Sequence, residues 1–379
     1  MPRTPMPEDE PPYEPADTPP AHYAERALLG AILLDPDLLP ALDQVGPASF
    51  AHSAHAAIFA AMHTVPAPTS PTAHTGLDWL NAVLAQARPQ APGLTPSYMH
   101  TLISACPRPH HAPAYAAILR SEHARRTLRL HAGRLAQAAT DTTVPDRPQY
   151  ALDAADALTG HLDELAERFP THSRPLPRTP APAASPLAGT DEGREAEQWL
   201  LACSVSQPDQ ARLMGWLTAD DFLHPFHAGL WRCVTALAHR GDPVDPVTVL
   251  WEAQHRGLLA TGIAPADVLA LLSAPVGSAG YWGERLVERT LLARALQAAQ
   301  HVTAYTADPA NSVHQLITGS RRALAELHAV RSRWHRATTP APTPAATPAA
   351  PRAGPRIPLT TQAAPLPATT GRPTAVRTP

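Results

Sequence analysis

The chain has 379 residues, of which 44% are hydrophobic and only 5% aromatic, and its formal net charge is −3. This length predicts two or three domains, and the near-neutral charge argues against a protein that coats nucleic acid. All 30 basic residues are arginine, so the absence of lysine excludes a Schiff-base lysine and the phosphate-binding lysine of a P-loop.

The sequence shows no sign of a secretory or membrane destination. Its N-terminus lacks the apolar core of a signal peptide, and no apolar run approaches the ~18 residues of a membrane span. Three cysteines, Cys106, Cys203 and Cys233, share no metal-ligand spacing and are expected to be small buried residues of a reducing compartment. We therefore expect a soluble, cytoplasmic protein.

Proline-rich segments divide the chain. Residues 1–20 contain eight prolines and five acidic side chains, and because proline fixes φ and lacks an amide donor, they predict a disordered tail. Residues 170–190 predict a semi-rigid linker, and residues 335–379, rich in Pro, Ala and Thr, predict a disordered basic tail. Two bodies of ordinary domain size remain, at 21–169 and 191–334.

The first body has the pattern of a series of helices. An amphipathic stretch over 24–33 ends near Asp35, a short apolar segment follows at 37–45, and Ser49 is expected to be the N-cap of a third helix. Further helices are expected over 77–87 and 97–104, and two long amphipathic helices over 115–139 and 150–169.

The second body repeats this order. A short helix is expected at 213–217, and longer ones over 222–238, 247–255, 266–272, 281–306 and 312–333. No segment alternates β-branched and polar residues as a strand would. We therefore predict an all-α fold of two helical-bundle domains, each ending in an antiparallel helical hairpin.

The shared order reflects an internal duplication. Residues 24–33 read AERALLGAIL, and residues 196–205, which lie 172 positions later, read AEQWLLACSV. The register continues without a gap, since Phe222 follows Phe50 and His227 follows His55 at the same offset. A repeat that keeps its register over this length predicts two copies of one helical module.

These motifs resemble the N-terminal domain of the DnaB-family replicative helicases. In that family a helix reading A-E-x-x-L-L-G-A-I-L is followed by a turn and then by F-x-x-x-x-H-x-x-I-F. The positions that carry the resemblance here are Glu25, Leu28, Leu29, Phe50, His55 and Phe59 in the first body and Glu197, Leu200, Leu201, Phe222, His227, Trp231 and Asp245 in the second.

Asp245 belongs to a second motif of the resemblance. Residues 241–249 are similar to the family's G-x-P-V-D-x-V-T-V segment. The first body departs from the family pattern at the corresponding place, because a proline-rich loop occupies 63–76.

The resemblance implies a docking module without the family's motor. The RecA-like ATPase of the family needs a phosphate-binding loop ending in Gly-Lys-Ser/Thr, which a chain without lysine cannot provide. We therefore expect no enzymatic activity, no catalytic residue, no cofactor and no metal.

The N-terminal domains of the family assemble into a collar through their hairpins and dock the primase. The resemblance accordingly implies a non-catalytic assembly or adaptor protein of DNA replication. Its implied partners are further copies of itself, a DnaG-type primase and a replicative helicase, with DNA bound only weakly if at all and no membrane partner.

Two histidine pairs have a spacing that metal ligands can adopt. His52 and His55, like His224 and His227, have the i, i+3 spacing that places two imidazoles on one helix face. A zinc site needs at least three protein ligands, and no acid or cysteine nearby in the sequence completes one. Packing or capping is the favoured interpretation of these histidines.

Glu25 and Glu197 are candidate catalytic carboxylates. We place each in the first turn of its helix, where the macrodipole favours an acid. No nucleophile or base accompanies either residue, so a role at the helix start is favoured.

The densest basic stretch lies on the helix expected over 115–139 and contains Arg120, Arg125, Arg126, Arg129 and Arg134. Since no aromatic residues are interleaved for base stacking, a solvated helix face or pairing with acids of the second body is favoured over DNA contact. The alternative function left open is a DNA-binding accessory or partition factor that uses this helix and the basic tail.

The closing helices of the two bodies carry apolar stripes. Their members are Leu158, Leu162 and Leu165 in the first body and Leu324, Leu327 and Val330 in the second. Such a stripe is commonly the core of its own bundle, but two similar hairpins in one chain can also pack on each other. The tandem would then be a covalent pseudo-dimer.

Overall fold

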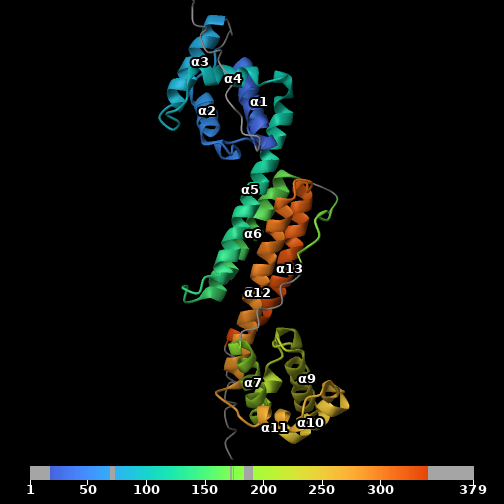
Figure 1. The fold of residues 1–379 in the computed structure, drawn as a ribbon. Helices are drawn as coiled ribbons and strands as arrows, with labels where there is room; N and C mark the ends of the chain where they lie inside the picture. The colour runs from blue at the N-terminus through green and yellow to red at the C-terminus, as the bar shows by residue number, and fades with distance from the viewer. Residues whose placement is uncertain (1–17, 69–72, 171–172, 174, 183–190, 340–379) are drawn as a thin grey trace, which may run out of the picture. The chain divides into compact units, whose positions relative to one another are not determined.

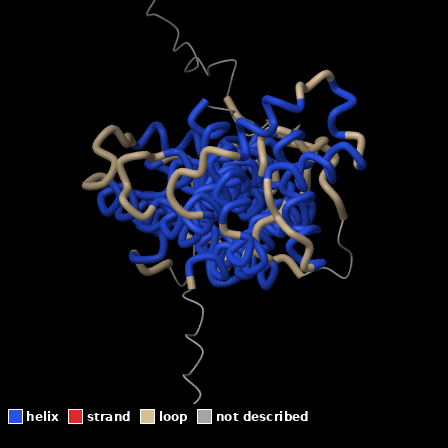
Figure 2. Tube along the Cα trace, turned by 90° about the horizontal axis from the view of Figure 1, so that it is seen from below, coloured by secondary structure: helices blue, strands red, loops and turns tan. Residues whose placement is uncertain are grey.

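A computed structural model describes residues 18–68, 73–170, 173, 175–182 and 191–339. Most of both predicted tails, 1–17 and 340–379, and part of the predicted linker lie outside the described residues. Every regular element of the described part is a helix, as Figure 2 shows, and this confirms the predicted all-α class. None of these helices is both long and apolar enough to span a bilayer.

The first copy of the module comprises the elements up to residue 168 (Figure 1). In chain order they are α1 (Pro20–Leu34), the 3₁₀ turns η1 (Pro36–Leu42) and η2 (Pro47–Ser49), α2 (Ser53–Thr64), α3 (Ala73–Ala87), α4 (Pro96–Ser104), η3 (Pro109–His111), α5 (Ala112–Thr140) and α6 (Arg147–Arg168).

The second copy repeats the order of the long helices. Its elements are α7 (Asp191–Ser206), α8 (Pro208–Leu213), η4 (Ala219–Asp221), α9 (Pro225–Arg240), α10 (Pro246–His255), η5 (Leu258–Thr261), α11 (Pro265–Leu272), α12 (Ala279–Ala307) and α13 (Val313–Thr338). The last helix continues to Thr338, which is four residues into the segment predicted as a tail.

Two local predictions were wrong. Ser49 lies in η2, and the N-cap of α2 is His52. The short helix expected at 213–217 lies earlier, at α8, because Pro208 occupies the first helical position, where its fixed φ favours a helix start and its missing amide leaves no donor unpaired.

Five helices enclose the core of the first bundle, because α1 contacts α2, α4 and the start of α5 while α2 also contacts α3. The apolar side chains that fill this core are fully or almost fully buried, and they include Leu28, Ile32, Phe59, Met62, Val83, Met99 and Leu102. Each complete burial of a Leu, Ile, Phe or Met side chain contributes roughly 1.5–3 kcal/mol.

Gly30 lies where α1 crosses α4, and a Cβ at this position would overlap the main-chain carbonyl of Leu102. We expect Gly30→Ala to lower the free energy of unfolding by about 1–3 kcal/mol, because the carbonyl belongs to backbone that cannot rotate away. Gly133→Ala is the matched control, since nothing lies within 4 Å of its added Cβ and alanine there favours the α5 helix by about 0.5–1 kcal/mol. Chemical denaturation measures both, and equal effects would contradict this packing.

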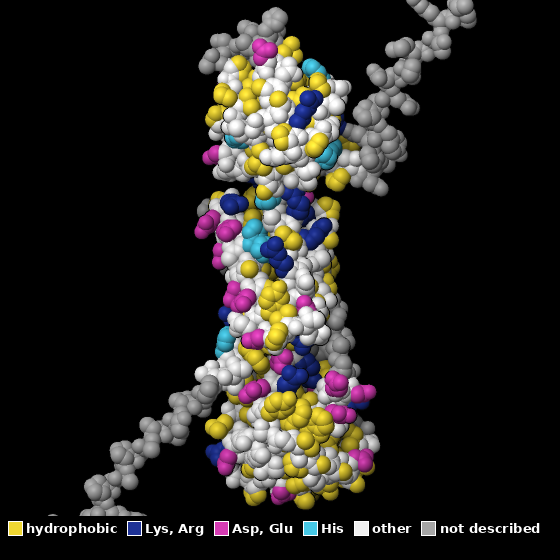
Figure 3. All heavy atoms as spheres, turned by 90° about the vertical axis from the view of Figure 1, so that its left-hand side faces the viewer, with side chains coloured by type: hydrophobic (Ala, Val, Ile, Leu, Met, Phe, Trp, Pro, Cys, Tyr) yellow, Lys and Arg dark blue, Asp and Glu magenta, His cyan; other side chains and the backbone are white. Residues whose placement is uncertain are grey.

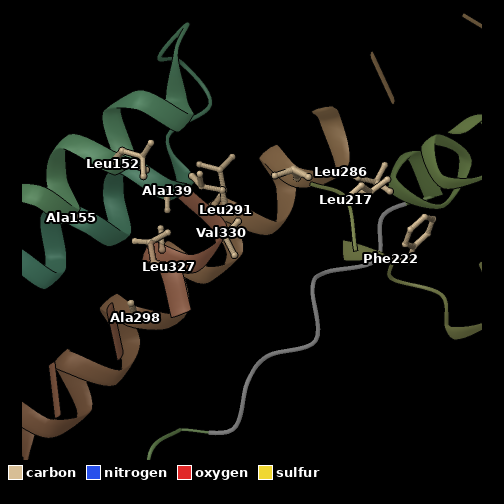
Figure 4. Packing of buried hydrophobic residues seen from close by; sticks show 14 of the residues in the cluster. Ala139, Leu152, Ala155, Leu217, Phe222, Leu286, Leu291, Ala298, Leu327 and Val330 are labelled. Atoms are coloured by element: carbon tan, nitrogen blue, oxygen red, sulfur yellow. The ribbon is translucent and has the colours of Figure 1, made fainter. Parts of the chain in front are cut away.

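The two helical hairpins pack on each other in one four-helix arrangement. α5 contacts both α6 and α12, α12 contacts α13, and α13 contacts α6. Figure 4 shows Leu152 of α6 beside Leu291 of α12 and Leu327 and Val330 of α13. These residues belong to one continuous apolar cluster that runs from Ala124 of α5 through α6 to Val330 and also contains the core of the second bundle.

Polar contacts fix the register between the hairpins. Arg331 pairs with Asp156 and Arg321 with Asp163, each at 2.5 Å, and both pairs join α13 to α6. Exposed pairs of this kind contribute only about 0–1 kcal/mol each, so the shared apolar core supplies the stability.

The described part of the predicted linker lies against the turn between α12 and α13. The Arg178 amide donates to the Asn311 side chain at 2.8 Å, and the Thr179 hydroxyl donates to Asp308 at 2.5 Å. Asn311 in turn donates to Thr179 and to the Tyr305 carbonyl. These bonds hold residues 175–182 to the second hairpin.

Candidate functional site

The buried carboxylate of Glu25 joins α1 to the beginning of α2. Glu25 is 2% exposed, and its oxygens accept hydrogen bonds from the Ala51 amide at 2.5 Å and the His52 amide at 3.4 Å. The Nδ1 atom of His55 lies 2.6 Å from the same carboxylate. Glu25 therefore satisfies amide donors that the start of α2 would otherwise leave unpaired.

His55 connects this carboxylate to Tyr98 of α4. Its ring is completely buried, with Nδ1 facing Glu25 and Nε2 lying 2.7 Å from the Tyr98 hydroxyl. Burial lowers the pKa of His55, an effect only partly opposed by the adjacent Glu25 carboxylate, so the ring is neutral. A neutral ring has one donor and one acceptor, which assigns Nδ1–H as donor to Glu25 and Nε2 as acceptor from Tyr98.

Glu25 is ionised in this arrangement. Burial alone would raise the pKa of Glu25, but the hydrogen bonds from His55 and the Ala51 and His52 amides outweigh burial and lower it. An ionised carboxylate that accepts three hydrogen bonds is a strong fixed acceptor. The pair can anchor two helices or bind a cation.

The second copy builds the same pair at the same offset of 172 positions. Glu197, fully buried, accepts from the Leu223 amide at 2.5 Å and the His224 amide at 3.3 Å, and lies 2.8 Å from His227 Nδ1. The duplication therefore extends beyond the apolar pattern to a buried polar contact between the same two helices of each copy.

The two copies differ in what surrounds the carboxylate. In the second copy the Arg289 guanidinium of α12 donates to Glu197 at 2.9 Å and to the Asp221 carbonyl at 2.7 Å. Arg333 of α13 pairs with the Asp221 side chain at 2.5 Å. In the first copy the ring of His22 lies beside the pair, with its centroid 5.1 Å from that of His55.

The placement of the two acids in first helical turns was wrong. α1 begins at Pro20 and α7 at Asp191, so Glu25 and Glu197 lie in the second turn of their helices. Each acid acts on the start of a different helix, 26 or 27 positions away in sequence, and not on its own helix.

A possible third ligand comes from elsewhere in the sequence. No acid or cysteine close to His52 and His55 in the chain completes a metal site, but the fold brings Glu25 and His22 of α1 to the same point. The signal available was the i, i+3 spacing of His22 and Glu25, which mirrors the spacing of His52 and His55. Tyr98 and Arg289 gave no sequence signal.

The pair makes the first bundle sensitive to acid. The folded-state pKa of His55 lies below its ordinary 6.5 and that of Glu25 below 4.5, so below pH 6.5 the unfolded chain binds protons that the folded chain does not. We expect the free energy of unfolding to fall as pH drops from 6.5 through the folded pKa of His55, and again from 4.5 through that of Glu25.

Denaturation at a series of pH values measures this slope. His55→Gln should flatten the part that begins at pH 6.5, whereas His63→Gln, at an exposed position of the same helix, should leave it unchanged. A profile that is level between pH 6.5 and 4.5 in the parent chain would be inconsistent with a neutral buried imidazole.

The apolar positions of the motif lie in the cores of their bundles. Leu28, Leu29 and Phe59 are fully buried in the first, as are Leu200 and Leu201 in the second. The rings of Phe50 and Phe59 are tilted against each other with their centroids 5.0 Å apart, and the ring centroids of Phe222 and Trp231 are 6.0 Å apart. These residues hold the helices that carry the acids and histidines.

Asp245 is the N-cap of α10. Its side chain accepts from the Val247 and Thr248 amides at 2.8 and 2.9 Å, while the Thr248 hydroxyl accepts from the Asp245 amide at 2.9 Å. This reciprocal arrangement is a capping box, so the Asp and Thr of the motif are explained by the start of a helix and need no catalytic role.

The six predicted hairpin residues lie together. Leu158, Leu162 and Leu165 of α6 and Leu324, Leu327 and Val330 of α13 are at most 4% exposed and belong to the cluster shared by both hairpins. They therefore face each other inside the chain and are not open stripes on its surface.

The arginine-rich stretch is largely occupied with main-chain carbonyls. Arg125 donates to the carbonyls of Asp308 and Asn311 at 2.7 Å each, at the C-terminus of α12, and Arg129 donates to that of Thr306 at 2.6 Å. Cations at a helix C-terminus are favoured by the macrodipole. This contact joins α5 to the far end of α12, so the two helices run antiparallel.

Arg126 and Arg120 make contacts within the first copy. Arg126 donates to the Ala48 carbonyl at 2.8 Å, and Arg120 donates to the side chain of Gln44 and lies over the Phe169 ring. Arg134 is exposed. On the face that Figure 3 shows, arginine and acidic side chains are interspersed without a continuous basic patch.

Arg125 tests the structural role of this stretch. We expect Arg125→Ala to lower the free energy of unfolding by about 2–3 kcal/mol, because it leaves several carbonyls at the end of α12 without their charged donor. Arg134→Ala removes the same charge from an exposed position of α5 and should change stability by less than about 0.5 kcal/mol. Similar losses for the two variants in denaturation would contradict the capping role.

The cysteines offer no reactive site. Cys203 and Cys233 are buried and free, and burial raises the pKa of the Cys233 thiol to about 11. Burial likewise raises the pKa of Cys106, which is half-buried. Thiols with raised pKa values are poor nucleophiles at neutral pH.

Comparison with known proteins identifies the repeated module. The family described as the DnaB-like helicase N terminal domain matches residues 17–121 and again residues 191–282. The two matches contain both Glu–His pairs and the helices that form them.

Two curated relatives of the chain are both named as replicative DNA helicases. The chain is 34% identical over 113 residues to the replicative DNA helicase DnaB of Mycobacterium leprae (strain TN), covering 29% of the chain and 19% of the relative. It is 28% identical over 138 residues to the replicative DNA helicase DnaC of Bacillus subtilis (strain 168), covering 35% of the chain and 30% of the relative. The matched regions thus span less than a third of either relative. No solved structure matches the chain.

Proposed function

We propose that this chain, which belongs to the family of the DnaB-like helicase N-terminal domain, is a non-catalytic adaptor of DNA replication in the cytoplasm. It presents two family domains held as a covalent pair. Its partners are a replicative helicase, a DnaG-type primase and further copies of itself.

The observation that carries this proposal is the shared core of the two hairpins. α5–α6 and α12–α13 bury their apolar stripes against each other, so two copies of a domain from helicases are joined in a fixed pair. Three such chains would present six domains, which matches the number in a helicase collar. The acids and histidines of the motif anchor helices.

Light scattering and capture experiments test this function. An adaptor should have a native mass of two or more chains, or should capture the helicase or the primase from the same organism. A strict monomer across concentration that captures neither protein contradicts it. Nucleotide hydrolysis above background that requires the purified chain would contradict the proposal that the chain is non-catalytic.

A DNA-binding accessory role is the alternative, but no described contact favours it. Arg125, Arg126 and Arg129 donate to carbonyls of the chain and so have fewer donors left for phosphates. Gel shifts at low and moderate salt distinguish the two functions, because binding through phosphates falls steeply with salt. Binding at low salt that collapses at moderate salt would favour the alternative, and no shift at either salt concentration would favour the adaptor.

A further inference from the structure

Three imidazoles and one carboxylate converge at the start of α2 in the first copy. His22 and Glu25 lie three positions apart on α1, and His52 and His55 lie three positions apart at the start of α2. The ring centroids of the three histidines are 4.7, 5.1 and 6.0 Å apart. One ligand atom each from His22, Glu25 and His55 lies within 4.8 Å of the others.

We propose that this cluster is a site for a divalent transition metal of the zinc type, with Glu25, His55 and His22 as ligands and His52 as the fourth. Imidazole nitrogens and carboxylate oxygens are ligands that zinc binds at about 2.0–2.2 Å. Two histidines and one carboxylate satisfy its minimum of three protein ligands, and the fourth imidazole allows a closed, tetrahedral site.

The site has a rigid half and an adjustable half. Glu25 and His55 are buried, and Glu25 is fixed by the Ala51 amide while the second nitrogen of His55 is held by the Tyr98 hydroxyl. A partner on the second ring nitrogen orients a histidine ligand in metal sites. His22 is half-buried and His52 is exposed, so their rings have room to turn toward the ion. The ligand atoms of His22, Glu25 and His55 lie within 4.8 Å of one another and would settle at the ~3.3 Å between ligand atoms around zinc. For the 2.6 Å contact between Glu25 and His55 this is a small lengthening.

The second copy lacks the features of this site, so we expect one metal ion per chain. The position that corresponds to His22 is Arg194, and the Glu197 carboxylate already has a cationic partner in Arg289 at 2.9 Å. Within the described residues, the ion pair of Glu25 involves His55 and no arginine. A metal ion in the first copy would supply the positive charge that Arg289 supplies in the second.

Metal binding would join α1 to α2 directly. The ion would take the place of the proton between His55 Nδ1 and Glu25, and that proton would move to Nε2, which would then donate to the Tyr98 hydroxyl. His22 of α1 and His52, at the start of α2, would join the same coordination shell. The consequence is a bundle whose first two helices are closed by metal, whereas the equivalent helices of the second bundle are closed by Arg289.

Titration of the untagged full chain with Zn²⁺ in a weak competing chelator tests the site, with Co²⁺ absorption reporting coordination geometry. We expect one saturable ion per chain and a tetrahedral Co²⁺ spectrum. His22→Ala and His52→Ala should each weaken binding at least tenfold. His22→Arg, which copies the residue of the second module, should abolish it.

His224→Ala is the matched control, because His224 is the counterpart of His52 in the second copy. It should leave affinity and stoichiometry unchanged. His22 and His52 are not core residues, so circular dichroism is expected to show these variants folded. Absence of saturable binding, unchanged affinity in His22→Ala and His52→Ala, or an equal loss in His224→Ala would each overturn the proposal.

Discussion

Replacing Glu25 by alanine is expected to lower the free energy of unfolding of the first bundle by about 3–5 kcal/mol, because it removes a buried carboxylate that accepts three hydrogen bonds. The substitution leaves the Ala51 and His52 amides without an acceptor and His55 without the carboxylate that fixes its ring. Each unsatisfied buried donor contributes about 1–3 kcal/mol to this loss.

Two further variants separate charge from shape at this position. Glu25→Gln keeps an oxygen acceptor of the same size and should cost less than Glu25→Ala. Asp37→Ala removes an acid from an exposed position of η1 and should be nearly neutral. Denaturation gives the totals, and hydrogen exchange localises the loss to α1, α2 and α4.

The second copy provides a matched test of the same contact. Glu197→Ala should destabilise the second bundle at least as much, because it also leaves the Arg289 guanidinium without its carboxylate. Increased exchange should then appear in α7 and α9. If either alanine variant unfolded at the same denaturant concentration as the parent chain, the Glu–His pair would not be what holds these helices.

Leu158→Asp is expected to lower the free energy of unfolding by at least about 4 kcal/mol, because it removes a fully buried leucine and places an unpaired charge in the core shared by the hairpins. Ala157→Asp is the control, since the adjacent position is exposed and receives the same side chain. The difference between the two variants isolates the contribution of the buried face of α6.

Tryptophan fluorescence reports mainly on the second copy in this experiment. Six of the seven tryptophans lie at residue 199 or later, outside α6 and the first copy. Because the hairpins share one core, the fluorescence transition of these tryptophans should shift in Leu158→Asp. An unchanged tryptophan transition would mean that the first hairpin contributes nothing to the second half.

The sequence predicted those features that depend on neighbours along one helix. The helical periods placed most long helices to within a few residues, and the fixed offset of 172 positions predicted the duplicated module that the family match confirms. The predicted helix starts were less accurate, as Ser49 shows. The backbone amides at the start of a helix can donate to a side chain that is distant in sequence, as those of Ala51 and His52 donate to Glu25.

The site depended on contacts that no local pattern contains. Glu25 meets His55 across 30 positions, and Arg125 reaches the Asp308 carbonyl across 183. Helical periodicity fixes which residues share a face, but it does not fix which face of another helix that face will meet. Only the packing of α1 on α2 and of α5 on α12 brings these groups together.

If the chain is a paired docking module for the replication machinery, as we propose, it should bind that machinery in solution. The purified full chain is mixed with the replicative helicase and the primase of the same organism, and native masses are measured. We expect a defined complex with at least one of them, containing a fixed number of chains and lost in Leu158→Asp but retained in Ala157→Asp. Separate elution of all three proteins across concentration and salt would contradict the claim.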